Sequence, residues 1–207
     1  MEKTLDFWFE FASPYSYPAA MRVAQLAEQV SVTVRWRVFL LGAVFQKYGW
    51  QTTPDKIFPA KGDYMWRDLP RICNSLNLPY QHPSVFPRNG MLAARICALY
   101  ANEPWLPDFV RSIYQANFAE DQDISSLNLI TSLLEKLGLS SAEILAAANT
   151  DAAKQALKDQ TQHALSTNVF GAPFMMVGDE PFWGNDRLEQ AIYFAANGKL
   201  PSNITMS

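Results

Sequence analysis

The sequence predicts an α/β fold in which a small four-stranded sheet is flanked by helices and interrupted by a long helical insertion. Three observations predict it. Residues 1–43 show a strand pattern, a helix pattern and a second strand pattern, and residues 167–207 return to two short strands and a helix. The segment between them shows a loop pattern followed by helical patterns, with no strand pattern. We therefore expect one domain formed by residues 1–43 and 167–207, and a helical insertion domain formed by residues 44–166.

The N-terminal part predicts a βαβ unit. In "TLDFWFEF", Leu5, Phe7 and Phe9 alternate with polar or aromatic residues, as in a strand with one buried face. A helix is expected from about residue 14 to 29, with small and apolar residues on one stripe. "VTVRWRVF" alternates again and predicts a second strand, so the connection is expected to be right-handed.

The middle of the chain predicts a loop followed by helices. Residues 42–64 mix Gly, Pro, Lys and aromatic residues, which is typical of a loop. Gly138 is suited to end the helix that follows the Ser125-Ser126 cap. Asp68 and Arg71 are three residues apart and predict a structural ion pair. The expected helices cover about 65–78 (with Pro70 near its middle), 90–102, 106–118, 126–138, 141–149 and 151–166.

The C-terminal part predicts a hairpin and a last helix. "APFMMVG" and "EPFWG" read as short strands joined by a turn at Gly178-Asp179. Asn185 or Asp186 is positioned to cap a helix over about 187–197, which Gly198 would end. Without the insertion, a βαβ unit followed by ββα remains, which is the thioredoxin-like arrangement.

Composition and charge exclude several classes of function. The chain has 207 residues with a net charge of −3 and no cluster of Lys or Arg, which argues against nucleic-acid binding. The N-terminus has no apolar signal segment and no stretch is long enough to span a membrane, so we expect a cytoplasmic, soluble protein. Cys73 and Cys97 lie in apolar helical settings and predict buried thiols without a disulfide. His82 and His163 have no ligand spacing, so no metal site is expected.

The turn after the first strand carries the residues most suggestive of chemistry. Thioredoxin-like folds place a Cys-x-x-Cys motif at this turn, but this chain has Ser13-Pro14-Tyr15-Ser16, which cannot exchange disulfides. Ser13 stands in the N-cap position of the expected helix, and one interpretation is that it only caps this helix. The other is that its hydroxyl donates a hydrogen bond to the thiolate of a ligand, assisted by the helix N-terminus.

Two features of the C-terminal part favour a ligand. Pro173 precedes a strand in "FGAPF", and a cis bond there would leave the backbone of Ala172 free to pair with an extended peptide. "WGNDR" precedes the last helix, whose N–H groups could bind a carboxylate, while Asp186 could pair with an ammonium group. These features describe a receptor for a small peptide with a thiol, a carboxylate and an amine, and glutathione fits this description. Lowering its thiol pKa of about 8.5 by about two units would make it mostly ionised at neutral pH.

Four stretches resemble one known family. "DFWFEFASPYSY", "FLLGAVFQKYG", "FPRNGMLAAR" and "VFGAPFMMVGDEPFWGNDRLE" are similar to the 2-hydroxychromene-2-carboxylate isomerases. These belong with the kappa-class glutathione transferases in the DsbA-like branch of the thioredoxin superfamily. The resemblance implies a homodimer that uses glutathione to interconvert 2-hydroxychromene-2-carboxylate and trans-o-hydroxybenzylidenepyruvate in aromatic-compound breakdown. It implies that the thiolate adds to the conjugated substrate, that the former double bond rotates, and that elimination releases the other isomer.

The resemblance also implies roles for individual residues. Ser13 corresponds to the serine that holds the glutathione sulfur. Ala172, before Pro173, corresponds to the residue whose backbone pairs with the cysteinyl part of glutathione. Lys47 and Lys61 resemble basic residues that meet carboxylates of glutathione or of the substrate. The segment expected around the γ-glutamyl group is formed by Trp183, Gly184, Asn185 and Asp186.

The insertion is expected to form the wall of the substrate pocket, which Tyr15 could line. Many relatives have Gly-Asn where this chain has Gly49-Trp50, so an asparagine contact is replaced by a ring that could narrow the pocket. Two alternatives to an isomerase remain. One is a kappa-type glutathione transferase that keeps the adduct as product, and the other is a redox-inactive thioredoxin-fold binding protein that does not bind glutathione.

Overall fold

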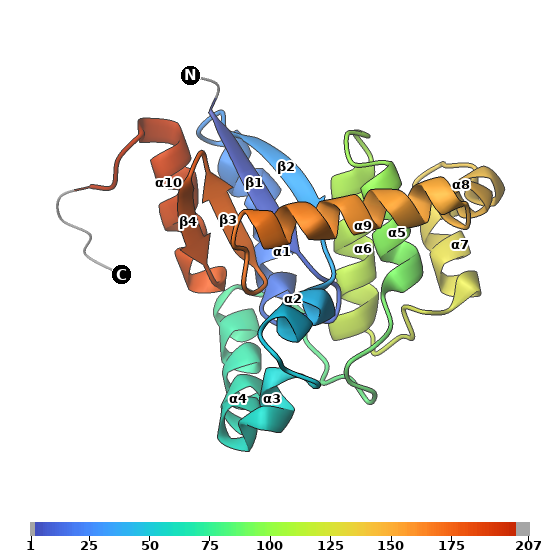
Figure 1. Cartoon of the computed structure of the whole chain (residues 1–207), viewed down its shortest axis with the longest axis horizontal. Coiled ribbons are helices and arrows are strands. Elements are labelled where there is room, and N and C mark those ends of the chain that lie inside the picture. Colours follow the sequence, from blue (N-terminus) through green and yellow to red (C-terminus); the bar gives the residue numbers. More distant parts are fainter. Residues whose placement is uncertain (1–2, 202–207) are drawn as a thin grey trace.

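The computed structural model describes residues 3–201 and shows one mixed four-stranded sheet with helices on both faces (Figure 1). The strands β1 (Thr4–Phe9), β2 (Thr33–Val38), β3 (Phe174–Val177) and β4 (Glu180–Trp183) lie in the order β2-β1-β3-β4. β1 pairs with β2 in parallel and with β3 antiparallel, and β3 pairs antiparallel with β4. The predicted thioredoxin-like α/β fold is therefore confirmed.

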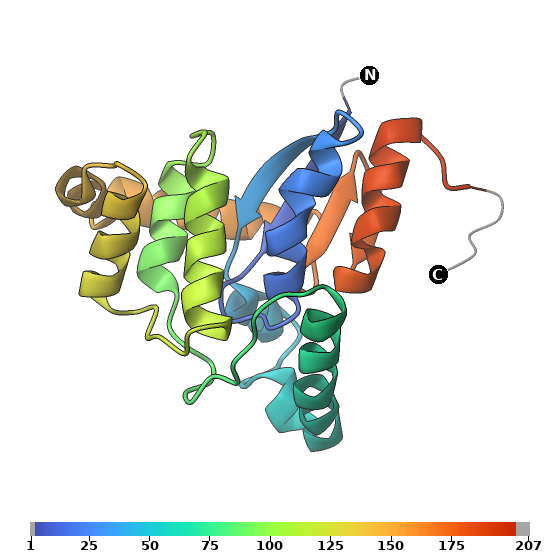
Figure 2. The same cartoon turned by 180° about the vertical axis from the view of Figure 1, so that it is seen from behind.

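The two faces of the sheet are covered by different helices. α1 (Ser16–Glu28) and α10 (Leu188–Asn197) lie on the face seen in Figure 2, where the alternating residues Leu5, Phe7 and Phe9 are fully buried. α9 (Asp151–Ser166) crosses the opposite face, where Trp8 belongs to a smaller core cluster with residues of α2 (Leu41–Lys47) and α9. The strand period of the sequence thus directs β1 into two separate cores.

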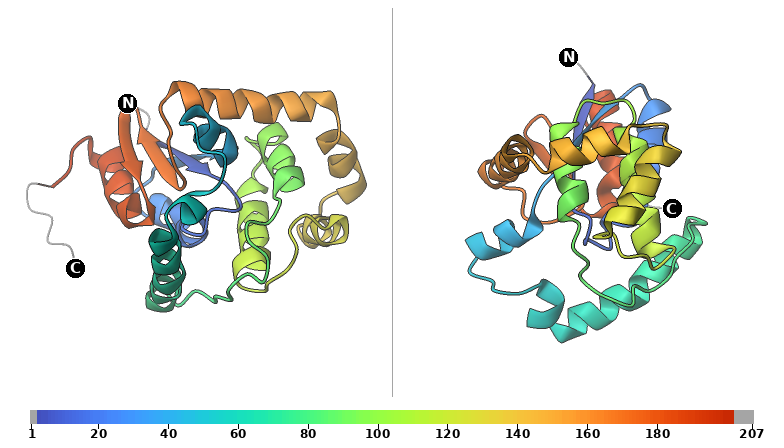
Figure 3. Two further views of the ribbon diagram at one scale, coloured as in Figure 1. Left: turned by 60° about the horizontal axis from the view of Figure 1, so that its bottom comes forward. Right: turned by 90° about the vertical axis from the view of Figure 1, so that its right-hand side faces the viewer.

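The insertion extends the larger core away from the sheet. α5 (Met91–Leu99), α6 (Leu106–Phe118), α7 (Leu127–Lys136) and α8 (Ser141–Ala148) form the helical half of the molecule (Figure 3). A single core cluster joins residues of β1 and α1 to residues of these helices. The division of the chain into two domains stays a prediction. No helix of residues 3–201 is long and apolar enough to cross a membrane.

The largest difference from the sequence prediction lies in residues 42–64, which were expected to be a loop. They contain most of α2, all of α3 (Pro54–Ile57) and the beginning of α4 (Pro59–Ser75). Both prolines begin helices, where the missing N–H is not needed, so the prolines that suggested a loop instead mark two helix starts. α4 also continues through Pro70.

The predicted capping residues are found at the ends of α7 but not at the start of α10. Ser126 caps α7 by accepting a hydrogen bond from the N–H of Leu129, and Gly138 follows the helix with a φ of 73°. Asn185 and Asp186, expected to cap the last helix, instead belong to a short 3₁₀ turn, η1 (Asn185–Arg187). Arg187 occupies the N-cap of α10 without a side-chain hydrogen bond. The cap prediction was wrong because this turn takes up the residues before the helix.

Candidate active site

Ser13 lies in the turn between β1 and α1, and its hydroxyl points to the chain just before β3. It donates a hydrogen bond to the carbonyl oxygen of Ala172 at 2.8 Å. Of the two interpretations of Ser13, the one in which it only caps α1 was wrong, because α1 begins at Ser16 with Tyr15 at the N-cap. The carbonyl of Ser13 closes a separate turn by accepting from the N–H of Ser16 at 3.1 Å. The Ser13 hydroxyl is therefore not used by the helix.

Ala172 and Pro173 form the wall opposite Ser13. Their peptide bond is cis, as predicted. The carbonyl of Pro173 accepts a hydrogen bond from the N–H of Gly184 at 3.0 Å, which ties this wall to the end of β4. Within the described residues, the N–H of Ala172 has no protein acceptor, although Ala172 is partly buried. An unpaired backbone N–H beside a hydroxyl is a suitable contact point for a peptide.

The segment after β4 forms a third side of the candidate site, next to Ser13 and to Ala172-Pro173. Gly184 has a φ of 108°, and a Cβ built at this position would collide with a carboxylate oxygen of Asp186. Asn185 is buried and accepts a hydrogen bond from the Arg22 guanidinium at 2.9 Å, while Arg22 also pairs with Glu189. The Asp186 carboxylate lies 3.8 Å from the Arg187 guanidinium, and 73% of its side-chain surface is accessible. Arg22 of α1 thus fixes the buried part of this segment, while Asp186 stays at the surface beside Arg187.

Tyr15 faces Asp68 of α4. Its hydroxyl donates to the Asp68 carboxylate at 3.1 Å. Burial raises the pKa of Tyr15 well above its ordinary value, and Asp68 raises it further, with a smaller contribution from Asp186. The phenol is therefore protonated at neutral pH and acts as a donor. The predicted Asp68–Arg71 ion pair does not occur among the described residues, because the Asp68 carboxylate accepts from Tyr15 instead.

Two side chains of α6 hold the Ser13 turn from beneath. The Tyr114 hydroxyl donates to the carbonyl of Glu10 at 2.8 Å, and the Asn117 amide donates to the carbonyl of Phe11 at 3.0 Å. Gly90 packs so closely that a Cβ there would lie 2.8 Å from the Cβ of Phe11. The turn that carries Ser13 is therefore positioned by the helical insertion as well as by the sheet.

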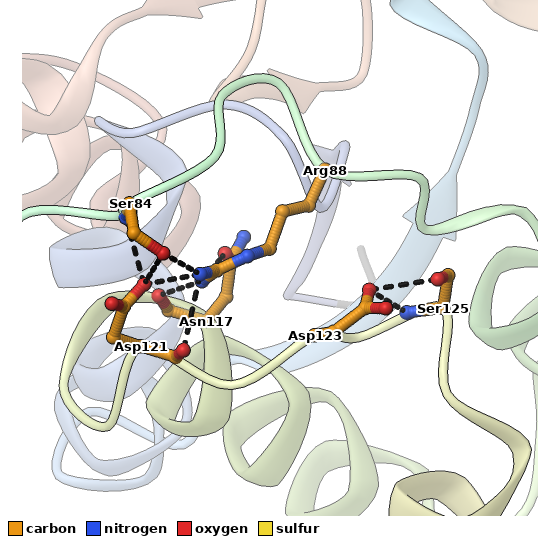
Figure 4. Close-up of polar contacts among 6 residues, drawn as sticks. All are labelled: Ser84, Arg88, Asn117, Asp121, Asp123 and Ser125. Carbon is orange, nitrogen blue, oxygen red and sulfur yellow. Dashed lines mark hydrogen bonds and ion pairs between the residues drawn. The ribbon is translucent and has the colours of Figure 1, made fainter.

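Asn117 is itself oriented by a buried arginine, as Figure 4 shows. Arg88 donates to the side-chain oxygen of Asn117 at 3.1 Å and to its backbone carbonyl at 3.0 Å, and it forms an ion pair with Asp121. Only 4% of the Arg88 side chain is exposed. The N–H of Ser84 and the Arg88 guanidinium hold the pKa of Asp121 below its usual range. A network thus runs from Asp121 through Arg88 and Asn117 to Phe11, two residues before Ser13.

Glu10 places a carboxyl group under the same turn. One carboxylate oxygen accepts from the N–H of Ala12 at 2.9 Å. Burial raises the pKa of Glu10 from its ordinary value of 4.5 to about 7, although hydrogen bonds from the N–H groups of Ala12 and Ser13 oppose this effect. Glu10 is therefore partly protonated at neutral pH.

The other predicted contact residues lie in α2, in α4 and in the connection between α2 and α3. Lys47 ends α2, and its ammonium donates to the carbonyl of Leu165 at 3.0 Å. The Trp50 ring lies tilted against the Phe45 ring with centroids 5.6 Å apart, and the Lys61 ammonium lies 4.8 Å from the ring centroid of Phe58. The structure thus groups Ser13, Ala172, Pro173, Gly184, Asn185 and Asp186. It brings none of Lys47, Trp50 and Lys61 into hydrogen-bond contact with them among the described residues.

The residues that support the turn were not found from the sequence. Glu10, Arg22, Asp68, Tyr114 and Asn117 form no motif, and their partners lie up to 167 positions away in the chain. The one available signal was "FPRNG", whose Arg88 and Gly90 both contribute to the support of Phe11. Cys73 and Cys97 are buried free thiols, as predicted, and residues 3–201 contain no group of His, Cys, Asp or Glu that could hold a metal ion.

Comparison with known proteins agrees with this geometry. The family described as a DSBA-like thioredoxin domain matches residues 4–193. The chain is 32% identical over 188 residues to a 2-hydroxychromene-2-carboxylate isomerase of Pseudomonas putida, covering 89% of this chain and 90% of that protein. The chain belongs to the 2-hydroxychromene-2-carboxylate isomerase family.

Two further comparisons relate this family to proteins of similar structure and sequence. The solved structure of a 2-hydroxychromene-2-carboxylate isomerase superimposes with a TM-score of 0.81 at 30% identity, covering 90% of this chain and 91% of that one. A kappa 1 glutathione S-transferase of Rattus norvegicus is 23% identical over 98% of this chain and 96% of its own. The isomerase family is thus joined to the kappa transferases through a shared DsbA-like fold.

Proposed function

We propose that this protein is a glutathione-dependent isomerase that interconverts 2-hydroxychromene-2-carboxylate and trans-o-hydroxybenzylidenepyruvate or a related aromatic acid. The observation that carries the proposal is the hydroxyl of Ser13 held against the Ala172 carbonyl, beside an N–H of Ala172 that has no protein acceptor in the described part of the chain. The membership of the isomerase family supports the reaction. The kappa relative, which is named a glutathione transferase, supports the cofactor.

The residues present fit glutathione. The N–H and carbonyl of Ala172 would pair with the cysteinyl part, as an added strand does. Gly184, Asn185 and Asp186, with Trp183 beside them, would hold the γ-glutamyl end, where the exposed Asp186 carboxylate suits an ammonium group. Lys61 is exposed and has no acidic partner among the described residues, so it is available for a carboxylate.

Ser13 has one hydroxyl proton, so it cannot donate to a sulfur while it donates to Ala172. On ligand binding, we expect the Ala172 carbonyl to accept from a ligand N–H and the Ser13 hydroxyl to turn to the thiolate. The exchange leaves neither group unpaired and replaces a neutral hydrogen bond by a charge-assisted one. When bound, glutathione supplies a thiolate that adds reversibly to the conjugated acid, and Ser13 keeps that sulfur ionised at neutral pH.

The substrate side is assigned to Tyr15, Lys47 and Trp50. Tyr15 is a protonated donor beside the segment after β4, since its pKa is raised. Lys47 brings a positive charge that suits a carboxylate, and Trp50, which is 36% exposed, offers an aromatic surface. The homodimer implied by the family resemblance and the cytoplasmic location expected from the sequence stay predictions.

Turnover with a limiting amount of glutathione tests the reaction type. An isomerase regenerates the thiol, so product formed from the aromatic acid should exceed the glutathione supplied many times over. Consumption of one glutathione per product would instead assign the protein to the transferase alternative. Calorimetric titration with millimolar glutathione separates both from a redox-inactive binding protein, which would give no saturable heat.

Titration of the bound thiol by ultraviolet absorbance tests the role of Ser13. In the wild type, the pKa of the glutathione thiol should fall by about two units from about 8.5. Ser13→Ala should bring it back toward that of free glutathione and lower the turnover strongly. Ser16→Ala is the matched control, because Ser16 belongs to the same turn but is fully buried. Equal thiol pKa values in wild type and Ser13→Ala would refute the assignment.

A further inference from the structure

A hollow opens between α2, α5 and α9, away from the residues assigned to glutathione. Its volume is about 380 Å³. α9 forms one wall, and the first turns of α2 and α5 form the other, as the left view of Figure 3 shows for the three helices. We name this hollow the α9 pocket. Its lining includes none of Ser13, Ala172 and Gly184.

The α9 pocket has an apolar floor with a positive rim. Leu40, Met91, Leu157 and Leu165 supply apolar surface. Three cationic residues line it, Arg95, Lys154 and Lys158, and no Asp or Glu does. This contrasts with the whole chain, whose net charge is −3. An apolar cavity with a few convergent charges of one sign is typical of a small-molecule site.

Two of the three cations are available. Lys154 pairs with Asp151 at 2.9 Å, so its charge is already compensated. Neither Arg95 nor Lys158 forms an ion pair or hydrogen bond with any described residue. They come from two different helices that pack against each other, Arg95 from α5 and Lys158 from α9. An anion between these helices could therefore meet both charges.

The wall of the pocket is preformed. The Thr161 hydroxyl accepts from the N–H of Leu40 at 3.1 Å and donates to the carbonyl of Leu157 at 2.8 Å. The bond from Leu40 ties α9 to the chain that leaves β2, and the bond to Leu157, within α9, orients the Thr161 hydroxyl. A ligand would thus enter a site whose shape does not have to be created, which lowers the entropic cost of binding.

We propose that the α9 pocket binds an organic monocarboxylate with a flat apolar body, with Arg95 and Lys158 holding the carboxylate and the leucine side chains covering the rings. The planar guanidinium can bind a carboxylate with two parallel hydrogen bonds. The volume suits a molecule of one or two rings. The pocket shares no residue with the glutathione contacts, and it meets the proposed substrate side only where Lys47 donates to the carbonyl of Leu165.

Isothermal titration with 2-naphthoate tests the proposal in the full chain, with glutathione present at saturation and then absent. We expect a saturable site in the α9 pocket that is distinct from the substrate side at Tyr15, Lys47 and Trp50 and whose affinity glutathione does not change. The Arg95→Gln/Lys158→Gln double variant should weaken binding at least tenfold. Lys154→Gln is the matched control, since its charge is paired, and should change the affinity by less than twofold. The neutral analogue 2-naphthalenemethanol should bind at least tenfold more weakly than 2-naphthoate.

Two further variants keep the test decisive. Lys158→Gln alone changes an exposed position and should fold normally while weakening binding severalfold. Ala43→Trp fills the space without changing its charge and should abolish binding. The proposal is overturned if 2-naphthoate shows no saturable binding, if the double variant binds like wild type, or if the neutral analogue binds equally well. It is also overturned if Ser13→Ala removes binding, since the ligand would then occupy the glutathione site.

Discussion

The two sides of the Ser13 turn are built in different ways. Beneath it, buried side chains of the insertion hold the Glu10 and Phe11 carbonyls at hydrogen-bond distances of 2.8 and 3.0 Å. On the side assigned to the substrate, Lys47 ends an exposed helix and contacts a backbone carbonyl, and Trp50 lies in the following connection against an aromatic ring. One side is a closed polar network and the other is an open aromatic surface.

This difference separates two tasks. A hydroxyl that must meet a sulfur needs a fixed position, and buried hydrogen bonds supply that rigidity because breaking them is costly. A surface that receives the apolar body of a substrate needs area and shape, which exposed aromatic side chains provide. Substitutions beneath the turn should therefore change stability and thiol ionisation together, whereas substitutions on the open side should change substrate binding alone.

The largest effect is expected from Arg88→Met. It leaves Asp121 without its cation and Asn117 without the donor that orients it. The two Asn117 oxygens each lose a buried donor, which costs about 1–3 kcal/mol apiece, so the free energy of unfolding in urea should fall by at least about 2 kcal/mol. Arg111→Met is the matched control, because Arg111 pairs with Asp108 on the exposed face of α6 and should cost less than about 1 kcal/mol. If both variants lose the same free energy of unfolding, the buried network stabilises the fold no more than an exposed ion pair does.

Glu10→Gln should remove a pH dependence of stability. In the wild type, the folded state holds the Glu10 proton up to a pKa of about 7, whereas the unfolded state releases it near 4.5. The folded state thus binds more protons between these values, and the free energy of unfolding falls as the pH rises from about 4.5 to 7, by up to about 3 kcal/mol.

Glutamine cannot ionise, so Glu10→Gln should match the wild type near pH 4 and exceed its stability at pH 8. Urea unfolding at a series of pH values measures this difference. Glu103→Gln, at an exposed position, is the control and should follow the wild-type curve. Parallel curves for wild type and Glu10→Gln would contradict the assignment of the raised pKa to this carboxyl group.

The sequence predicted the parts of the site that follow from local pattern. Strand alternation placed Leu5, Phe7 and Phe9 in the core, and the position of Pro173 before a strand predicted its cis bond. The support of the turn could not be predicted in this way. Asn117 is 106 residues from Phe11, and nothing in its neighbourhood distinguishes it from any other helical asparagine. A distant partner also explains why Ser13 does not cap α1. Its hydroxyl donates to the carbonyl of Ala172, 159 positions away, which local sequence does not reveal.

Asn117→Ala should have the next largest effect on the free energy of unfolding, and it should also change the ionisation of the bound glutathione thiol. It leaves the Phe11 carbonyl without its donor, which costs about 1–3 kcal/mol. If the turn positions Ser13, the pKa of the bound glutathione thiol should also rise, as measured by ultraviolet titration. Asn149→Ala removes an exposed amide that donates to Leu145 and should change neither quantity beyond a few tenths of a kcal/mol. Lost stability with an unchanged thiol pKa would leave Asn117 a structural residue only.

The smallest effect on stability is expected on the open side, from Trp50→Ala. The ring lies near Phe45 and Phe58, with centroids 5.6 and 6.5 Å away, and such partly exposed aromatic contacts contribute about 1 kcal/mol. The thiol pKa should not move, because no contact of Trp50 reaches the Ser13 turn in the described structure. The KM for the aromatic acid should change severalfold with little change in kcat, since Trp50 would contribute binding area and not chemistry. A change in thiol pKa as large as that caused by Asn117→Ala would show that the two sides are coupled.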